Sequence, residues 1–262
     1  MPKSGTTWMK AVTHLIANRT RYSTLNDSPL FTSNPHETVP FLEFDLYFKN
    51  QFPDLESIPE PRIFSTHVPY ASLPSSITDS RCRIVYVCRN PLDQLISSWH
   101  YASKLPWCKD PPKLEEAFEL YCKGIHPFGP FQNHVLGYWR ASLEIPDKIL
   151  FLKYEDLKED NILCMKRLAE FLGFPFSMDE EEQGAAEEIT KFCSFENMKN
   201  LEGNKNGKRH LGIPHACYFR KGEVGDWRNY LTPLMAERLE KLIQERLEGS
   251  GLSFNMSCKK DA

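Results

Sequence analysis

Apolar positions follow two different spacings along the chain, and each spacing predicts a different element. Near-continuous apolar runs at residues 83–88 and 148–152 predict strands buried on both faces, which is typical of a parallel sheet. Residues 62–66 (RIFST) predict a further, short strand that ends at His67. Helical spacing, with matching start and stop residues, predicts helices over residues 8–19, 91–103, 113–123, 132–142, 156–172 and 233–247.

The order of these elements indicates the fold class. Strands alternate with helices, so we expect an α/β fold in which helices flank a parallel sheet. The sequence shows no internal repeat and no interdomain linker, and we therefore predict a single domain over residues 1–262. The stretch from residue 202 to 221 carries no clear periodicity, and a loop of that length is usually functional or mobile.

Composition narrows the class of protein. The net charge is −3 and the isoelectric point about 6.3, which argues against a general nucleic-acid or membrane-surface binder. The eight cysteines form no CxxC pair, and neither a signal peptide nor a membrane-spanning run is visible. We therefore expect a cytoplasmic protein in a reducing compartment. His210, His215 and Cys217 match no familiar ligand spacing, so we predict no metal site.

A candidate phosphate-binding loop stands at the start of the chain, where Lys3-Ser4-Gly5-Thr6-Thr7 leads into the first predicted helix. Small residues at such a place let backbone N–H groups turn toward a phosphate, and the helix dipole adds positive potential. The lysine adds a charge and the hydroxyls add donors. The pattern departs from the standard P-loop because the lysine precedes the glycine. Taken alone, it fits a polar helix start with a threonine cap equally well.

Two further segments carry residues suited to binding anions. Arg89 follows the predicted strand at residues 83–88, at the edge where ligands of open α/β sheets collect, and Ser97 lies two turns into the next helix. An arginine there can hold a phosphate through two hydrogen bonds. Residues 220–228 combine adjacent cations with two glycines, which permit close backbone approach to an anion. A surface arginine and a solvated charged turn are the alternative interpretations.

With these three elements in this order, the chain resembles the cytosolic sulfotransferases, and their plant branch in particular. Six segments carry the resemblance at family-like spacing: residues 2–8 (PKSGTTW, the 5′-phosphosulfate loop), 65–70 (the catalytic histidine), 86–97 (the 3′-phosphate), 153–156 and 194–198 (the adenine side) and 220–227 (RKGxxGDW). The similarity runs from residue 2 to about Phe254. The resemblance implies a P-loop-like parallel sheet flanked by helices.

The resemblance also implies a reaction, the transfer of a sulfuryl group from 3′-phosphoadenosine 5′-phosphosulfate (PAPS) to a hydroxyl of a small phenolic, flavonoid, steroid or similar acceptor. This donor is anionic at both ends, so it needs two cationic sites. The implied roles are Lys3, Ser4, Gly5, Thr6 and Thr7 at the 5′-phosphosulfate; Arg89, Ser97, Arg220, Lys221 and Gly222 at the 3′-phosphate; Trp8, Phe195 and Tyr154 around the adenine; and His67 as general base. Lys3 would also stabilise charge on the leaving group, and His67 would take the acceptor's proton, without a metal ion.

The chain departs from the family pattern at its start. Family members carry a hydrophobic strand that feeds the phosphosulfate loop, whereas here Met1 directly precedes Pro2. We therefore expect a sheet without that strand, in an N-terminally truncated domain, and a frayed terminus at Lys3 and Ser4. The dimer motif of animal members is degraded within residues 228–237, so we expect a monomer.

Three functions are open at this point. An active small-molecule sulfotransferase explains every motif. A truncated, weakly active or inactive remnant differs from it only at the N-terminus. A P-loop kinase that uses ATP and magnesium explains residues 3–7, but neither Arg89 with Ser97 nor residues 220–222. We expect tighter binding of adenosine 3′,5′-bisphosphate than of ATP, and no partner among nucleic acids or membranes.

Overall fold

The computed structural model describes residues 1–48 and 50–256. The chain forms two compact units, each assembled from segments that are distant in sequence. Unit 1 comprises Met1–Gly5, His67–Glu159 and Glu223–Ala262, and unit 2 comprises Thr6–Thr66 and Asp160–Gly222. The assignment of residues 1–262 to one domain stays a prediction.

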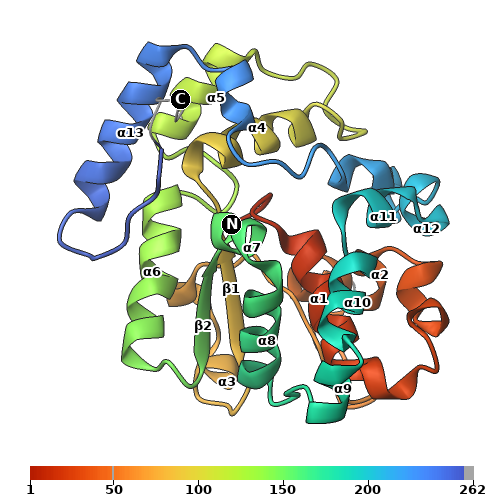
Figure 1. Ribbon diagram of the computed structural model, residues 1–262. Coiled ribbons are helices and arrows are strands. Elements are labelled where there is room, and N and C mark those ends of the chain that lie inside the picture. The colour runs from red at the N-terminus through yellow and green to blue at the C-terminus, as the bar shows by residue number, and fades with distance from the viewer. Residues whose placement is uncertain (49, 257–262) are drawn as a thin grey trace. The chain divides into compact units, whose positions relative to one another are not determined.

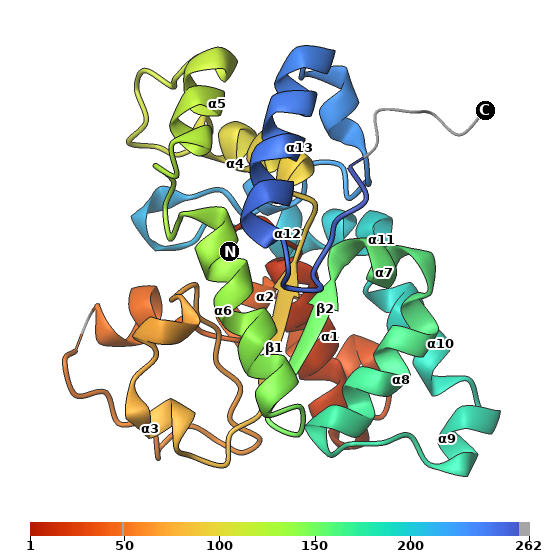
Figure 2. The same cartoon turned by 90° about the vertical axis from the view of Figure 1, so that its left-hand side faces the viewer.

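Unit 1 is built on a two-stranded parallel sheet, in which β1 (Ile84–Cys88) pairs with β2 (Ile149–Lys153) along its whole length. Parallel strands need a long crossover, and the connection here contains α4 (Pro91–Ala102), α5 (Leu114–Cys122) and α6 (Phe131–Glu144). α6 runs alongside β2 (Figures 1 and 2). This arrangement confirms the predicted α/β fold with parallel strands and flanking helices.

The core of unit 1 joins the sheet to its helices. Tyr86 and Cys88 of β1 and Leu92 of α4 are buried in it, together with Leu239 of α13 (Pro233–Leu247). α13 contacts α4, α5 and α6, so one helix closes the core against all three crossover helices. Ile84, Val85 and Val87 of the same strand are only half-buried, so the predicted burial of β1 on both faces is confirmed only in part.

The carboxyl edge of the sheet places two segments of the predicted site. β1 ends at Cys88, directly before Arg89, and α7 (Tyr154–Glu159) begins directly after β2. Because the strands are parallel and in register, both segments leave the sheet at the same edge. In open α/β sheets this is the edge at which ligands bind. The remaining helical turns of unit 1 are α3 (Ser75–Thr78) and the 3₁₀ turns Tyr70–Ser72 and Asp226–Asn229.

Unit 2 is helical, and α1 (Thr6–Asn18) is its central element. Val12, Leu15 and Ile16 recur at helical spacing on α1 and are fully buried. α1 contacts α2, α8 and α10. The other helices of unit 2 are α2 (Pro35–Thr38), the π-helical segment Leu42–Tyr47, α8 (Asn161–Leu172), α9 (Met178–Glu182), α10 (Ala185–Phe192), α11 (Phe195–Asn200), α12 (Glu202–Lys205) and the 3₁₀ turns Arg19–Arg21, Leu25–Asp27, Pro29–Phe31, His210–Gly212 and His215–Tyr218.

The helix predicted over residues 156–172 is interrupted. The structure has α7 up to Glu159 and α8 from Asn161, with Asp160 between them. The Asp160 side chain accepts a hydrogen bond from Leu163 N, so it caps a new helix instead of continuing the old one. The predicted stop at Gly173 is confirmed, because Gly173 adopts the left-handed conformation (φ 83°) that ends many helices.

The strand predicted over residues 62–66 is wrong. Only Ser65 pairs, through a single parallel bridge to Phe41. The next residue after Phe41 starts the π-helical segment Leu42–Tyr47, so the partner backbone turns away and no ladder can extend. The loop expected over residues 202–221 is also more structured than predicted, because it contains α12 and two 3₁₀ turns.

The N-terminal residues are packed, which contradicts the expected fraying. Met1 is 4% exposed and belongs to the core of unit 1, and Ser4 is fully buried. The Pro2 carbonyl accepts a hydrogen bond from Gln94 Nε2 over 2.9 Å. These contacts anchor the start of the loop within unit 1. Among the helices that the structure describes, none has the length and apolar character needed to span a membrane.

Candidate active site

The loop at Lys3–Gly5 has an unusual backbone. Lys3 has φ 61° and Gly5 has φ 106°, so two residues separated by one position lie in the left-handed region. For a residue with a side chain, such as Lys3, this conformation costs about 1 kcal/mol or more and is often kept at functional sites. The hydroxyl oxygen of Ser4, between them, is buried and has no hydrogen-bond partner among the described residues. Such an enclosed donor suits an anion.

Tyr154 brings the loop and the end of β1 together in unit 1. A Cβ atom placed on Gly5 would lie 2.8 Å from Cδ2 of Tyr154, so only glycine fits against this ring. The guanidinium of Arg89 lies 4.7 Å from the centre of the same ring. Two predicted site segments that are more than eighty positions apart in sequence thus converge on one aromatic side chain.

Arg89 is held from several sides. Its side chain is 6% exposed, and its Nη2 atom donates to the Glu223 carbonyl over 2.5 Å and lies 3.5 Å from the Asp93 carboxylate. The Nε atom is buried without a hydrogen-bond partner in the described chain. Because buried donors are nearly always paired, this atom is available to a ligand. Ser97, the other predicted residue of this segment, is buried on α4.

Asp93 is a site residue that sequence reasoning did not single out. Its carboxylate is fully buried and accepts hydrogen bonds from Gly225 N (2.7 Å) and Trp227 N (3.0 Å). It therefore fixes the backbone of the predicted glycine-rich segment next to Arg89. The sequence carried a signal in the Asp93 carboxylate one helical turn after Arg89, but its partners more than 130 residues away needed the fold.

The predicted catalytic histidine, His67, is anchored through its backbone. His134 Nε2 donates to the His67 carbonyl over 2.9 Å, and His134 Nδ1 lies 2.9 Å from the hydroxyl of Tyr86. Since Nε2 carries the hydrogen, Nδ1 accepts from the Tyr86 hydroxyl. Burial lowers the pKa of His134 to about 3, so the ring is neutral at physiological pH. The ring of His67 itself lies 5.4 Å from that of Phe128.

In unit 2 the predicted residues Thr6, Thr7 and Trp8 form the first turn of α1. This turn contains no acidic side chain that would neutralise the positive end of the helix dipole. The Thr7 hydroxyl lies 3.0 Å from Nε2 of His36. No acidic residue of this turn therefore opposes the binding of an anion there, and the predicted role of the turn in phosphate binding stays a prediction.

Phe195 and Gly222 also meet in unit 2. Gly222 has φ 70°, and a Cβ atom there would lie 2.6 Å from the ring of Phe195, so this contact requires glycine. Phe195 starts α11, after Ser194 has capped the helix, and its ring centre lies 6.3 Å from that of Phe219. Lys221, next to Gly222, is exposed, and Arg220 is half-buried.

The predicted residues are distributed over both units. Unit 1 carries Lys3, Ser4, Gly5, His67, Arg89, Ser97 and Tyr154, and unit 2 carries Thr6, Thr7, Trp8, Phe195, Arg220, Lys221 and Gly222. Within unit 1 the structure brings Gly5, Arg89 and Tyr154 together. Within unit 2 it brings Phe195 and Gly222 together. His134, Asp93 and His36 are the supporting residues that the sequence did not reveal.

Comparison with known proteins places these segments in one protein family. The family model of the sulfotransferase domain matches residues 1–251, which include segments of both units. Cytosolic sulfotransferase 15 of Arabidopsis thaliana is 50% identical over 261 residues, an alignment that covers 98% of this chain and 73% of that protein.

Solved structures agree with this result. An Arabidopsis thaliana protein described as a putative steroid sulphotransferase is 40% identical, with a TM-score of 0.74, and the match covers 97% of this chain and 76% of that one. A mouse sulfotransferase complexed with PAP is 28% identical, with a TM-score of 0.74, and the match covers 95% and 82% of the two chains. The chain therefore belongs to the sulfotransferase family, together with the plant cytosolic sulfotransferases that the motifs predicted.

Proposed function

We propose that this protein transfers a sulfuryl group from PAPS to a hydroxyl of a small acceptor, with His67 as general base. The observation that carries the proposal is the convergence of Gly5 and Arg89 on the ring of Tyr154. This contact joins the 5′-phosphosulfate loop to the 3′-phosphate segment, and a second phosphate is what separates this nucleotide from ATP. Family membership supports the same reaction.

Two buried polar atoms are suited to bind an anionic nucleotide such as PAPS. The Ser4 hydroxyl and Arg89 Nε are enclosed and have no hydrogen-bond partner among the described residues. Leaving a buried donor unsatisfied costs about 1–3 kcal/mol, so an anionic ligand that accepts from it recovers this cost. The PAP complex of the mouse relative supports the same ligand class.

The residues that would hold the donor fall into three groups. Lys3 and the start of α1 supply positive charge and hydroxyl donors for the 5′-phosphosulfate. Arg89, with Ser97 and residues 220–222, supplies cations and a glycine amide for the 3′-phosphate. Trp8, Phe195 and Tyr154 supply aromatic rings for the adenine. PAPS itself supplies the sulfuryl group that is transferred.

His67 takes the proton of the acceptor hydroxyl in this proposal. Histidine suits the task because its ordinary pKa lies close to physiological pH. His134 holds the backbone carbonyl of His67 and so restrains the position from which the imidazole acts. Among residues 1–48 and 50–256 no group of three or more His, Cys, Asp or Glu side chains gathers as metal ligands would.

The proposal includes the protein's setting. The Arabidopsis relatives are named cytosolic sulfotransferases, in agreement with the predicted cytoplasmic location. The solved Arabidopsis relative is described as a putative steroid sulphotransferase, so steroids belong in the acceptor panel beside phenols and flavonols. We propose that the protein works as a monomer, which gel filtration at micromolar concentration tests.

The decisive experiment measures transfer of labelled sulfate from PAPS to this acceptor panel. We expect His67→Ala to abolish transfer while adenosine 3′,5′-bisphosphate (PAP) still binds, and Lys3→Ala to weaken both. His14→Ala is a matched control, because His14 is also half-buried, its ring lies 3.0 Å from the Tyr22 hydroxyl, and it belongs to no site segment. Near-full turnover of His67→Ala, or tighter binding of ATP than of PAP, would contradict the proposal.

A further inference from the structure

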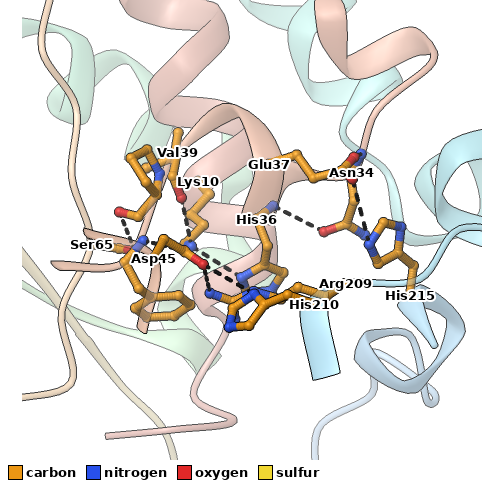
Figure 3. A network of polar contacts seen from close by, with 12 residues as sticks. Lys10, Asn34, His36, Glu37, Val39, Asp45, Ser65, Arg209, His210 and His215 are labelled. Atoms are coloured by element: carbon orange, nitrogen blue, oxygen red, sulfur yellow. Dashed lines mark hydrogen bonds and ion pairs between the residues drawn. The ribbon is translucent and has the colours of Figure 1, made fainter. Parts of the chain in front are cut away.

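Three polar side chains of unit 2, those of Thr7, His36 and Lys10, form a chain of contacts at the start of α1. Figure 3 shows its Lys10–His36 part. Nζ of Lys10 lies 3.0 Å from Nδ1 of His36, and Nε2 of His36 lies 3.0 Å from the hydroxyl of Thr7. Lys10 also donates to the Val39 carbonyl over 2.7 Å. Thr7 and Lys10 are one turn apart on α1, so His36 joins two neighbouring positions of the same helix face.

The environment and protonation of Lys10 bear on the direction of these hydrogen bonds. Burial, together with the Arg209 guanidinium, lowers the pKa of Lys10 well below its usual range, while the carboxylates of Asp45 and Glu43 oppose that shift. As an ammonium, Nζ of Lys10 has no lone pair and can only donate, so it donates both to the Val39 carbonyl and to Nδ1 of His36. Lys10 Nζ also lies 3.5 Å from the ring centre of Phe41, a position that suits a cation.

The direction of the remaining bonds follows. When Nδ1 of His36 accepts from Lys10, the hydrogen of the neutral ring is on Nε2, and His36 then donates to the Thr7 oxygen. The Thr7 hydroxyl has a single hydrogen, which this arrangement leaves pointing to a different acceptor. An anion at the start of α1 is such an acceptor.

The His36 ring is held in place on all sides. It is 5% exposed and stacks between Phe41, at 5.4 Å, and Tyr218, at 4.1 Å between ring centres. Its backbone N–H is bound by the Asn34 side chain that caps α2 (2.9 Å). A ring fixed in this way can hold the Thr7 hydroxyl in one orientation.

We propose that His36 is a positioning residue for the sulfuryl donor: it donates from Nε2 to Thr7 and thereby directs the Thr7 hydroxyl hydrogen toward the 5′-phosphate end of the nucleotide. The inference rests on the proposed role of Thr7 in the 5′-phosphosulfate loop. It goes beyond that role because His36 acts through Thr7 and belongs to none of the motif segments.

A double-mutant cycle tests the proposal through calorimetric binding of PAP and of adenosine 3′-monophosphate, which lacks the 5′-phosphate. We expect Thr7→Val to weaken PAP binding about tenfold, since it removes a hydrogen bond to a charged group. His36→Phe keeps an aromatic ring for the stack and should weaken PAP binding about fivefold. The double variant should bind PAP no more weakly than Thr7→Val, and adenosine 3′-monophosphate should bind all variants equally.

The outcomes distinguish a failure of the Thr7 assignment from a failure of the His36 proposal. If Thr7→Val binds PAP like the wild-type protein, the assignment of Thr7 to the donor site fails, and the inference fails with it. If Thr7→Val weakens PAP binding but His36→Phe does not, or if His36→Phe weakens both nucleotides equally, only the inference fails.

Two further measurements cover the case in which His36→Phe does not fold, because that variant leaves Lys10 without its acceptor. His36→Gln places an amide donor near Nε2, and we expect its PAP affinity to stay within about twofold of the wild type. In the wild-type protein, ¹⁵N resonances of the histidine rings report the tautomer directly. We expect Nε2–H on His36, and an Nδ1–H or doubly protonated ring would overturn the proposal.

Discussion

His134 Nε2 donates a hydrogen bond of 2.9 Å to the backbone carbonyl of His67, and this bond ties the proposed general base to α6. The direction of this bond is fixed because a carbonyl oxygen can only accept, so Nδ1 of the neutral ring accepts from the Tyr86 hydroxyl. His134 thus acts on His67 through the backbone carbonyl of His67 and not through its imidazole. The consequence for catalysis concerns position, not proton affinity.

The first prediction follows from this bond. His134→Phe removes it, and we expect turnover to fall about tenfold or more while the affinity for PAP changes little, since misplacing a catalytic group by a fraction of an ångström is costly. His134→Gln, which keeps a donor, should recover part of the loss. Tyr86→Phe is the control, because it removes the far partner of His134 only. Equal losses of turnover in Tyr86→Phe and His134→Phe would contradict the positioning role.

The second prediction concerns acid stability. The pKa of His134 is about 3 in the folded protein and near 6.5 in an unfolded chain. Between these values the unfolded state binds more protons, so the free energy of unfolding falls as the pH drops below 6.5, by about 1.4 kcal/mol per pH unit for this one group.

Urea unfolding between about pH 7 and about pH 4.5 measures this effect. His134→Gln should lose less stability over that range than the wild-type protein does. Burial also lowers the pKa values of His14 and His126, each to about 4. These two residues remain in both proteins, so the difference between the two curves isolates His134. Parallel curves would show that His134 is not buried as a neutral ring.

The third prediction concerns the carboxylate that holds the glycine-rich segment. Asp93→Asn removes the charge opposite Arg89 and turns an amide toward one of two backbone N–H donors. Breaking a buried ion pair by changing one partner costs about 3–5 kcal/mol, so we expect a large drop in the urea midpoint together with weaker PAP binding. Glu119→Gln is the matched control, because the ion pair of Glu119 with Arg238 is exposed. A midpoint that falls equally in both variants would contradict the role of Asp93.

The fourth prediction separates backbone strain from steric contact. Gly222→Ala places a methyl group against the Phe195 ring. Gly249 has the same left-handed backbone (φ 72°), but a Cβ atom there would meet no heavy atom of the described chain within 4 Å apart from its two chain neighbours. Both variants should lose about 1 kcal/mol of stability from the conformation alone. Only Gly222→Ala should also weaken PAP binding. Unchanged PAP affinity in Gly222→Ala would remove Phe195 from the proposed adenine site.

Local sequence was sufficient to predict secondary structure where the residues that determine an element are neighbours in the chain. The apolar runs predicted β1 and β2 to within one residue, and the predicted helix at residues 233–247 coincides with α13 because Thr232 caps it and proline suits its first position. Such signals lie within a few residues of each other, so they can be interpreted before the fold is known.

Local sequence was insufficient to predict the structure where a segment contacts residues that lie far away along the chain. The run at residues 62–66 has the composition of a strand, but its neighbour enters the π-helical segment Leu42–Tyr47 after one bridge. The fraying expected at Lys3 and Ser4 is prevented by the burial of Met1 and by Gln94 on α4. In both cases a contact from another part of the chain decided the outcome.

The candidate site divides in the same way. The chemistry of Lys3-Ser4-Gly5-Thr6-Thr7, Arg89 and residues 220–222 is visible in the sequence, because small residues and cations at element ends suit anions wherever they occur. The tertiary structure alone decided that Tyr154 contacts both Gly5 and Arg89, that Asp93 binds Gly225 N, and that His36 lies within 3.0 Å of the Thr7 hydroxyl. The reason is physical: residue type sets what a side chain can bind, whereas direction and partner depend on atoms that folding brings from distant segments to within about 3 Å.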